Sequence, residues 1–81
     1  MKLEFAAKSD AQSLCDRLHD WMLANDRNYA ASVAAGQTQA WAVPYQVKDE
    51  AGAVLNPAWC VTVKPRCMDA LTAQEKAALH E

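Results

Sequence analysis

Residues 9–22 read SDAQSLCDRLHDWM and give the strongest secondary-structure signal in the chain. Apolar side chains recur here every third or fourth position, while charged residues occupy the opposite arc, as in an amphipathic helix. Ser9 with Gln12 three residues later forms a capping-box sequence, which predicts the start of that helix. We expect Leu18 to lie at the centre of the buried stripe. The stripe consists of Ala11, Leu14, Cys15, Leu18 and Met22, with Trp21 beside it.

The C-terminal end of this helix leaves two alternatives. The polar run at residues 25–28 favours a break, after which Asn25 or Asp26 caps a second, short helix within residues 26–35. Gly36 suits the position just after that helix, because glycine ends helices without steric cost. A single bent helix is the alternative, since the apolar residues on either side of the polar run keep one helical phase. We favour the break.

Three strands are predicted from segments in which apolar and polar residues alternate. They lie at residues 1–5, 40–47 and 55–63. The second is expected at an edge of the sheet, because Pro44 cannot donate a ladder hydrogen bond. The alternating apolar residues expected on one face are Met1, Leu3, Phe5, Trp41, Val43, Tyr45, Val47, Leu55, Trp59, Val61 and Val63.

The second and third strands are expected to form a hairpin over residues 39–64. The sequence Asp49-Glu50-Ala51-Gly52 is typical of a type I turn closed by a glycine bulge, which places Asp49 opposite Ala53. We expect a bulge at Asn56-Pro57 in the returning strand. Carried along the strands, this register pairs Trp41 with Val61, Val43 with Trp59 and Val47 with Leu55, all on one face.

These elements predict one compact α+β domain over residues 1–81. Pro65 ends the third strand, and Thr72 with Glu75 predicts a capping box for a short C-terminal helix. The order is β-α-α-β-β-α. We expect a three-stranded sheet in the order 1-3-2, with strand one antiparallel to strand three and the long helix packed on one face.

Composition excludes several classes of partner. The formal net charge is −2 and no run of Lys or Arg exists, so duplex DNA is not an expected partner. No stretch approaches the roughly 20 apolar residues of a membrane span, and the N-terminus lacks the pattern of a signal peptide. Three cysteines without a CxxC pair indicate free thiols in a reducing compartment. We therefore expect a cytoplasmic protein.

Catalytic and metal-binding patterns are weak in this sequence. Cys15 and His19 stand at metal-ligand spacing on one helix, but the paired cysteines of a zinc knuckle are lacking, so we interpret Cys15 as a core residue. Cys67 follows Lys64 and Arg66, which lower a thiol pKa; we interpret it as an ordinary thiol on a loop near solvent. With only two glycines, no phosphate-binding loop is expected. We expect no enzyme, no cofactor and no metal.

Aromatic residues give the strongest hint of function. Three tryptophans in 81 residues suit an interface, because a large apolar side chain with a polar tip is enriched there. We expect a protein-interaction module that binds a protein partner or a second copy of itself through the side of strand two. The expected contact residues are Trp41, Ala42, Pro44 and Tyr45. The alternative is a single-stranded nucleic-acid binder that stacks bases on Trp41 or Tyr45, with Lys48, Lys64 and Arg66 nearby.

Overall fold

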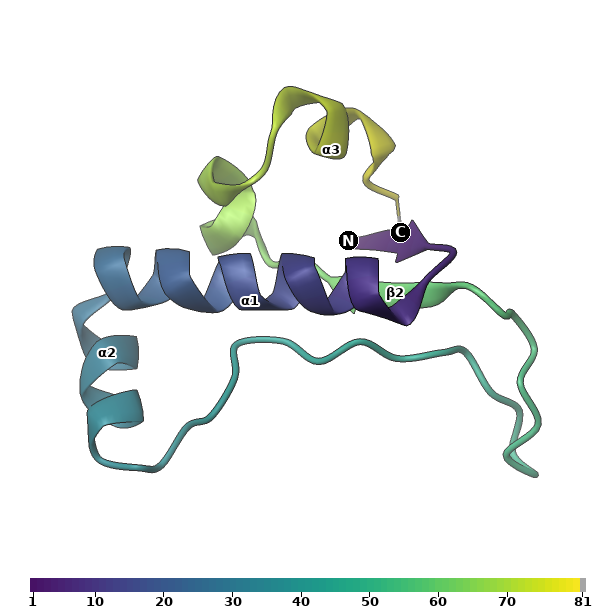
Figure 1. Cartoon of the computed structure of the whole chain (residues 1–81), viewed down its shortest axis with the longest axis horizontal. Helices are drawn as coiled ribbons and strands as arrows, with labels where there is room; N and C mark the ends of the chain where they lie inside the picture. Colours follow the sequence, from purple (N-terminus) through teal and green to yellow (C-terminus); the bar gives the residue numbers. More distant parts are fainter. Residues whose placement is uncertain (81) are drawn as a thin grey trace.

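The computed structural model describes residues 1–80 and confirms the α+β class (Figure 1). A two-stranded antiparallel sheet lies against one long helix, and the shorter helices flank that helix and the sheet. The elements in chain order are β1 (Lys2–Phe5), α1 (Lys8–Asn25), α2 (Arg27–Ala34), β2 (Trp59–Thr62), the 3-10 helix η1 (Pro65–Ala70) and α3 (Ala73–Ala78).

Helix α1 buries the stripe that its periodicity predicts. All five positions of the stripe are at most 2% exposed, and Leu18 and Met22 are completely buried. They pack in one apolar cluster with Leu3 of β1 and Val61 of β2. The predicted capping box at Ser9 is wrong: Ala7 precedes the helix without a side-chain cap, and Gln12 donates to Asp16 instead. Burial of the stripe, not the cap, therefore positions this helix.

The predicted break after the long helix is confirmed. Asp26 ends α1 and begins α2, and its carboxylate accepts a hydrogen bond of 3.0 Å from the backbone N–H of Tyr29. The same carboxylate forms an ion pair with Arg66 of η1 at 2.6 Å. Asp26 thereby fixes the angle at which α2 leaves α1 and ties that corner to η1.

The sheet is smaller than predicted. Strands β1 and β2 are antiparallel, with Leu3 opposite Val61, as expected for strands one and three. The predicted strand at residues 40–47 is not formed, so the three-stranded sheet is wrong in its extent. This segment meets β2 only at Tyr45, whose backbone N–H and C=O bond to Cys60 at 2.9 and 2.7 Å. On the other side of β1, the backbone of Lys2 pairs with His80.

The register of the hairpin changes between its turn and its base. At the turn, Asp49 donates to the carbonyl of Ala53 at 2.9 Å, as predicted. Next to the turn, Lys48 pairs with Val54, and at the base of the hairpin Tyr45 pairs with Cys60. Between these two pairs the first segment advances by three residues and the returning segment by six. The returning segment thus holds three extra residues. The predicted pairs of Val43 with Trp59 and of Trp41 with Val61 are therefore wrong.

The extra residues have an identifiable local cause. Pro57 has no backbone N–H to donate, and the Asn56 side chain accepts a hydrogen bond of 3.0 Å from the N–H of Ala58. Gln46 donates to the carbonyl of Pro57, which closes the bulge against the opposite segment. An odd shift in register transfers side chains to the other face of a sheet. Tyr45 therefore shares the face of Cys60 and lies away from α1.

The C-terminal part closes the fold. The predicted capping box is confirmed, with Thr72 accepting from the N–H of Glu75 and Glu75 accepting from the N–H of Thr72. Glu75 also pairs with Arg17 of α1 at 2.6 Å. Helix η1 is not among the predicted elements, although Pro65 marks its first residue. Within residues 1–80, none of the helices is both long and apolar enough to cross a membrane.

Candidate protein-binding surface

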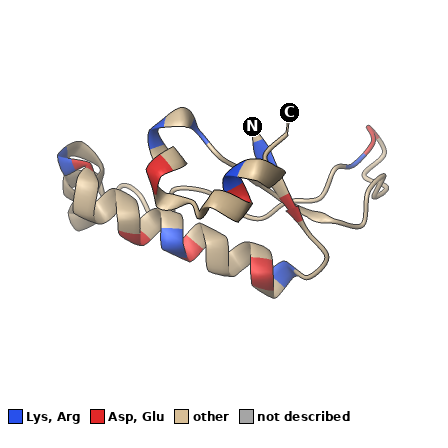
Figure 2. Cartoon of the chain, turned by 90° about the horizontal axis from the view of Figure 1, so that it is seen from above, with Lys and Arg blue, Asp and Glu red and all other residues tan. Residues whose placement is uncertain are grey.

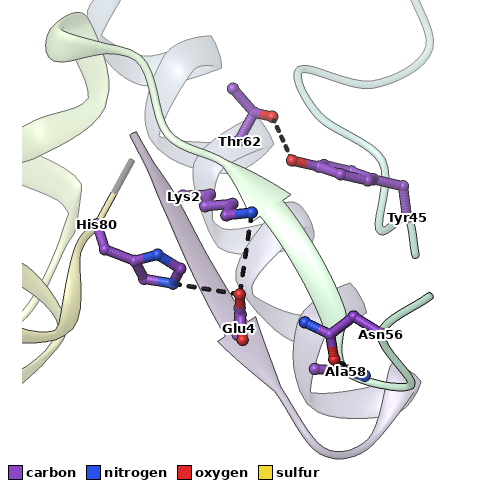
Figure 3. A network of polar contacts seen from close by, with 7 residues as sticks. All are labelled: Lys2, Glu4, Tyr45, Asn56, Ala58, Thr62 and His80. Atoms are coloured by element: carbon purple, nitrogen blue, oxygen red, sulfur yellow. Dashed lines mark hydrogen bonds and ion pairs between the residues drawn. The ribbon is translucent and has the colours of Figure 1, made fainter. Parts of the chain in front are cut away.

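One face of the sheet is covered and the other is open. Helix α1 packs on the inner face, and the outer face carries a row of side chains that meet one another rather than a helix (Figure 3). We call this surface the open sheet face. It comprises Lys2, Glu4, Tyr45, Thr62 and His80, which come from both strands and from the two segments that bridge to them, and, by alternation from Tyr45, Val43. Cys60 lies on the same face between Glu4 and Tyr45 and is completely buried there.

The apolar part of the open sheet face is Val43 with Tyr45. Val43 is 68% exposed and Tyr45 is 38% exposed, whereas Pro44 between them is buried. This alternation is the reverse of the predicted one and follows from the odd register shift. A shallow depression lies beside Tyr45, lined by Met1, Lys2 and Thr62. Exposed apolar side chains grouped on one face mark a typical interaction site.

Polar contacts across the open sheet face are long. Glu4 Oε1 lies 3.9 Å from Lys2 Nζ and 3.4 Å from His80 Nε2, and the Thr62 hydroxyl donates to the Tyr45 hydroxyl at 3.4 Å (Figure 3). Exposed pairs at such distances contribute little to stability. A partner can therefore rearrange these side chains at small cost in free energy.

The four contact residues expected from the sequence do not lie on one surface. Tyr45 belongs to the open sheet face, but Pro44 is buried, and Trp41 and Ala42 are half-buried against the core. The Trp41 ring meets the Tyr29 ring edge to face, with centroids 5.2 Å apart, and Lys64 Nζ stands 4.8 Å from its centre. Trp41 thus anchors its segment to α2, which leaves Tyr45 as the predicted aromatic that a partner can reach.

Cys67 lies beneath Trp41, so the prediction of a thiol near solvent is wrong. Cys67 is fully buried, and burial raises its pKa, although the Trp41 side chain and the charges of Lys64 and Arg66 oppose that rise. Trp41 Nε1 is itself buried and has no hydrogen-bond partner among the described residues. A protonated, buried thiol is a poor nucleophile.

A partly buried polar contact lies close by. The hydroxyl of Tyr29 is 2.7 Å from His19 Nδ1, and burial raises the pKa of Tyr29, with the nearby Cys67 adding to the effect. His19 is thereby engaged with a tyrosine. Cys15, one turn earlier, is buried, and burial followed by the charge of Asp16 raises its pKa. In the part of the chain that the structure describes, no three His, Cys, Asp or Glu side chains gather around a common point.

Sequence reasoning missed Val43 and the exposed pair Val54 and Leu55. Val43 and Leu55 follow the strand-like alternation that predicts one buried face, whereas that alternation makes no prediction for Val54. Comparison with known proteins does not add residues to this surface. No protein-family model, no curated protein and no solved structure matches the chain.

Proposed function

We propose that this protein is a non-enzymatic interaction module that binds another protein chain through its open sheet face. The exposure of Val43 and Tyr45 on the uncovered side of the sheet carries the proposal. A two-layer fold that leaves apolar residues on one sheet face gains free energy when a partner covers them. The three cysteines are free and buried, which fits a chain that works in a reducing compartment such as the cytoplasm.

Single-stranded nucleic acid is less well supported as the ligand. Base stacking needs exposed aromatic rings with cations beside them. Trp41 is packed against Tyr29 and already carries Lys64 over its ring, so it offers no free platform. Tyr45 remains, and the lysine nearest to it on the depression, Lys2, lies next to Glu4. The local charge is therefore balanced rather than basic.

Site-specific photo-crosslinking tests the proposal. A photoreactive amino acid replaces Val43 in the chain as it is made in cells, and the same residue replaces Gln12 on the exposed side of α1 as the control. We expect an adduct with protein from position 43 and none from position 12. Equal adducts from both positions, or an adduct from position 43 that nuclease removes, would contradict a protein-binding open sheet face.

A further inference from the structure

The chain is more extended than a compact monomer of its size. Its radius of gyration is 13.6 Å, whereas a compact chain of this length has about 11.7 Å. Its accessible surface is 5327 Å², whereas a globular monomer of this mass exposes about 4,800 Å². The chain therefore exposes about 500 Å² more than an average monomer of its mass.

A projecting hairpin accounts for the extended shape. We call residues 47–57 the arm; it extends from the sheet away from α1 and α2 (Figures 1 and 2). Backbone hydrogen bonds join its two sides: the N–H of Leu55 donates to the carbonyl of Val47, and the N–H of Asp49 donates to the carbonyl of Ala53. The Asp49 carboxylate also accepts hydrogen bonds from the N–H groups of Ala51 and Ala53. The arm is therefore a formed hairpin that points away from the body of its own chain.

The arm carries apolar residues with nothing packed on them. Leu55 is 64% exposed and Val54 is 48% exposed. Leu55 pairs with Val47, and alternation along residues 43–47 places Leu55 on the same side as Tyr45 and Val43. Leu55, Tyr45 and Val43 thus lie along one surface, with the projecting arm at one end and the shallow depression beside Tyr45 at the other.

The charges at the two ends of this surface are opposite. Glu50 stands at the tip of the arm, exposed and with no ion-pair partner among residues 1–80. Lys2 lines the depression, and its only carboxylate neighbour in the same described range, Glu4, is 3.9 Å away and also faces His80. The remaining charges of the arm are Asp49, whose carboxylate caps the turn, and Lys48, which pairs with Val54 on the other side of the hairpin.

We propose that two copies of this chain bind each other about a two-fold axis, each laying its arm on the open sheet face of the other. This rests on the proposed function and names its partner. Leu55 of one copy packs on Tyr45 and Val43 of the second, and Glu50 of one approaches Lys2 of the second. A two-fold axis makes both contacts twice, so a surface with a projecting arm at one end and a depression at the other becomes self-complementary.

The interface expected from these contacts is small. An interface of about 500 Å² per copy, the size of that excess, lies at the low end of specific interfaces, so we expect a weak dimer with a dissociation constant in roughly the micromolar range or above. Sedimentation equilibrium over that concentration range measures it. We expect the mass to rise from 8.9 kDa towards twice that value as the concentration increases.

Charge exchange between chains tests the geometry. We expect Lys2→Glu and Glu50→Lys each to weaken self-association about tenfold, because each reverses two surface ion pairs. An equimolar mixture of the two variants restores association, since both contacts are then between opposite charges. Asp20→Lys on α1 makes the same change in charge as Glu50→Lys and is expected to leave association unchanged. Circular dichroism checks that each variant is folded.

The outcomes separate this proposal from the proposed function. A wild-type chain that stays at 8.9 kDa at every concentration overturns the dimer; a protein adduct from position 43 then leaves the interaction module standing with a different partner. A wild-type dimer whose dissociation constant neither charge variant changes, or whose affinity the mixture of variants fails to restore, overturns the exchange of arms.

Discussion

Replacing Leu18 with alanine should remove the centre of the contact between α1 and the sheet. Leu18 is completely buried and belongs to the cluster that joins α1 to β1 and β2. The loss of three buried carbon atoms costs about 2.4 kcal/mol at about 0.8 kcal/mol each, and the residual cavity raises the cost to about 3 kcal/mol. A domain of this length has only about 4–12 kcal/mol of stability in total, so the expected loss is a large share.

Urea or thermal unfolding followed by circular dichroism measures this loss. We expect the midpoint of thermal unfolding to fall by about 15 °C. Leu55→Ala is the matched control, because the same atoms are removed at a position that is 64% exposed. At a concentration below that of self-association, the control should change the unfolding free energy by less than about 0.5 kcal/mol. Equal losses from the two variants, or an unchanged midpoint for Leu18→Ala, would show that α1 packs by another face.

Further expectations concern the thiols and pH. Cys15, Cys60 and Cys67 are buried, so a thiol reagent should modify them slowly in the native protein and all three rapidly in denaturant; rapid native labelling of any of them would contradict its burial. Burial raises the pKa of Cys15 and of Cys67 above the ordinary value of 9.0, so the folded state favours the protonated thiols. The stability that these protonated thiols contribute is complete below about pH 9 and is lost as pH rises through their folded-state pKa. The urea midpoint should therefore fall as pH rises above about 9, and it should fall less in Cys67→Ala. Two carboxylates matter in acid. Hydrogen bonds from the N–H of Tyr29 and then from Arg66 hold the pKa of Asp26 below its ordinary value of 3.8. Partial burial raises the pKa of Glu75, but hydrogen bonds from the N–H of Thr72 and from Arg17 outweigh it and hold that pKa below 4.5. Stability from both carboxylates is present above those values and lost as pH falls below them, so Asp26→Asn should flatten the acid limb of the stability profile; an unchanged limb would contradict this role.

Local patterns in this sequence predict local structure well. The stripe on α1 is correct at every position because it depends only on the spacing of apolar residues within one helix. The break at Asp26 and the capping box at Thr72 are correct, and each is made by side chains within three residues of the backbone they bond. The turn at Asp49 is likewise local and correct. The equally local capping box at Ser9 is wrong, because α1 begins earlier and Gln12 donates to Asp16 instead.

The candidate surface was harder to predict because it depends on pairing between distant segments. The sequence predicts a bulge at Asn56-Pro57 but not the number of extra residues in it. That number decides which face of the sheet each side chain of residues 43–47 lies on, and an odd number moves each of them to the opposite face. Trp41 lies inward because Tyr29 of α2 meets its ring, a contact that no alternation within residues 40–47 encodes. The strand-like pattern therefore identified the right segment and assigned its side chains to the wrong faces.

The outward position of Val43 and Tyr45 underlies both proposals, and nuclear Overhauser contacts in the native protein measure it. We expect contacts from the Tyr45 backbone to Cys60 and from the Tyr45 ring to Thr62, together with contacts between the rings of Trp41 and Tyr29. Contacts of Val43 with Trp59 and of Trp41 with Val61 would instead show the uninterrupted register. In that register Val43 and Tyr45 face α1, and the open sheet face described above does not exist.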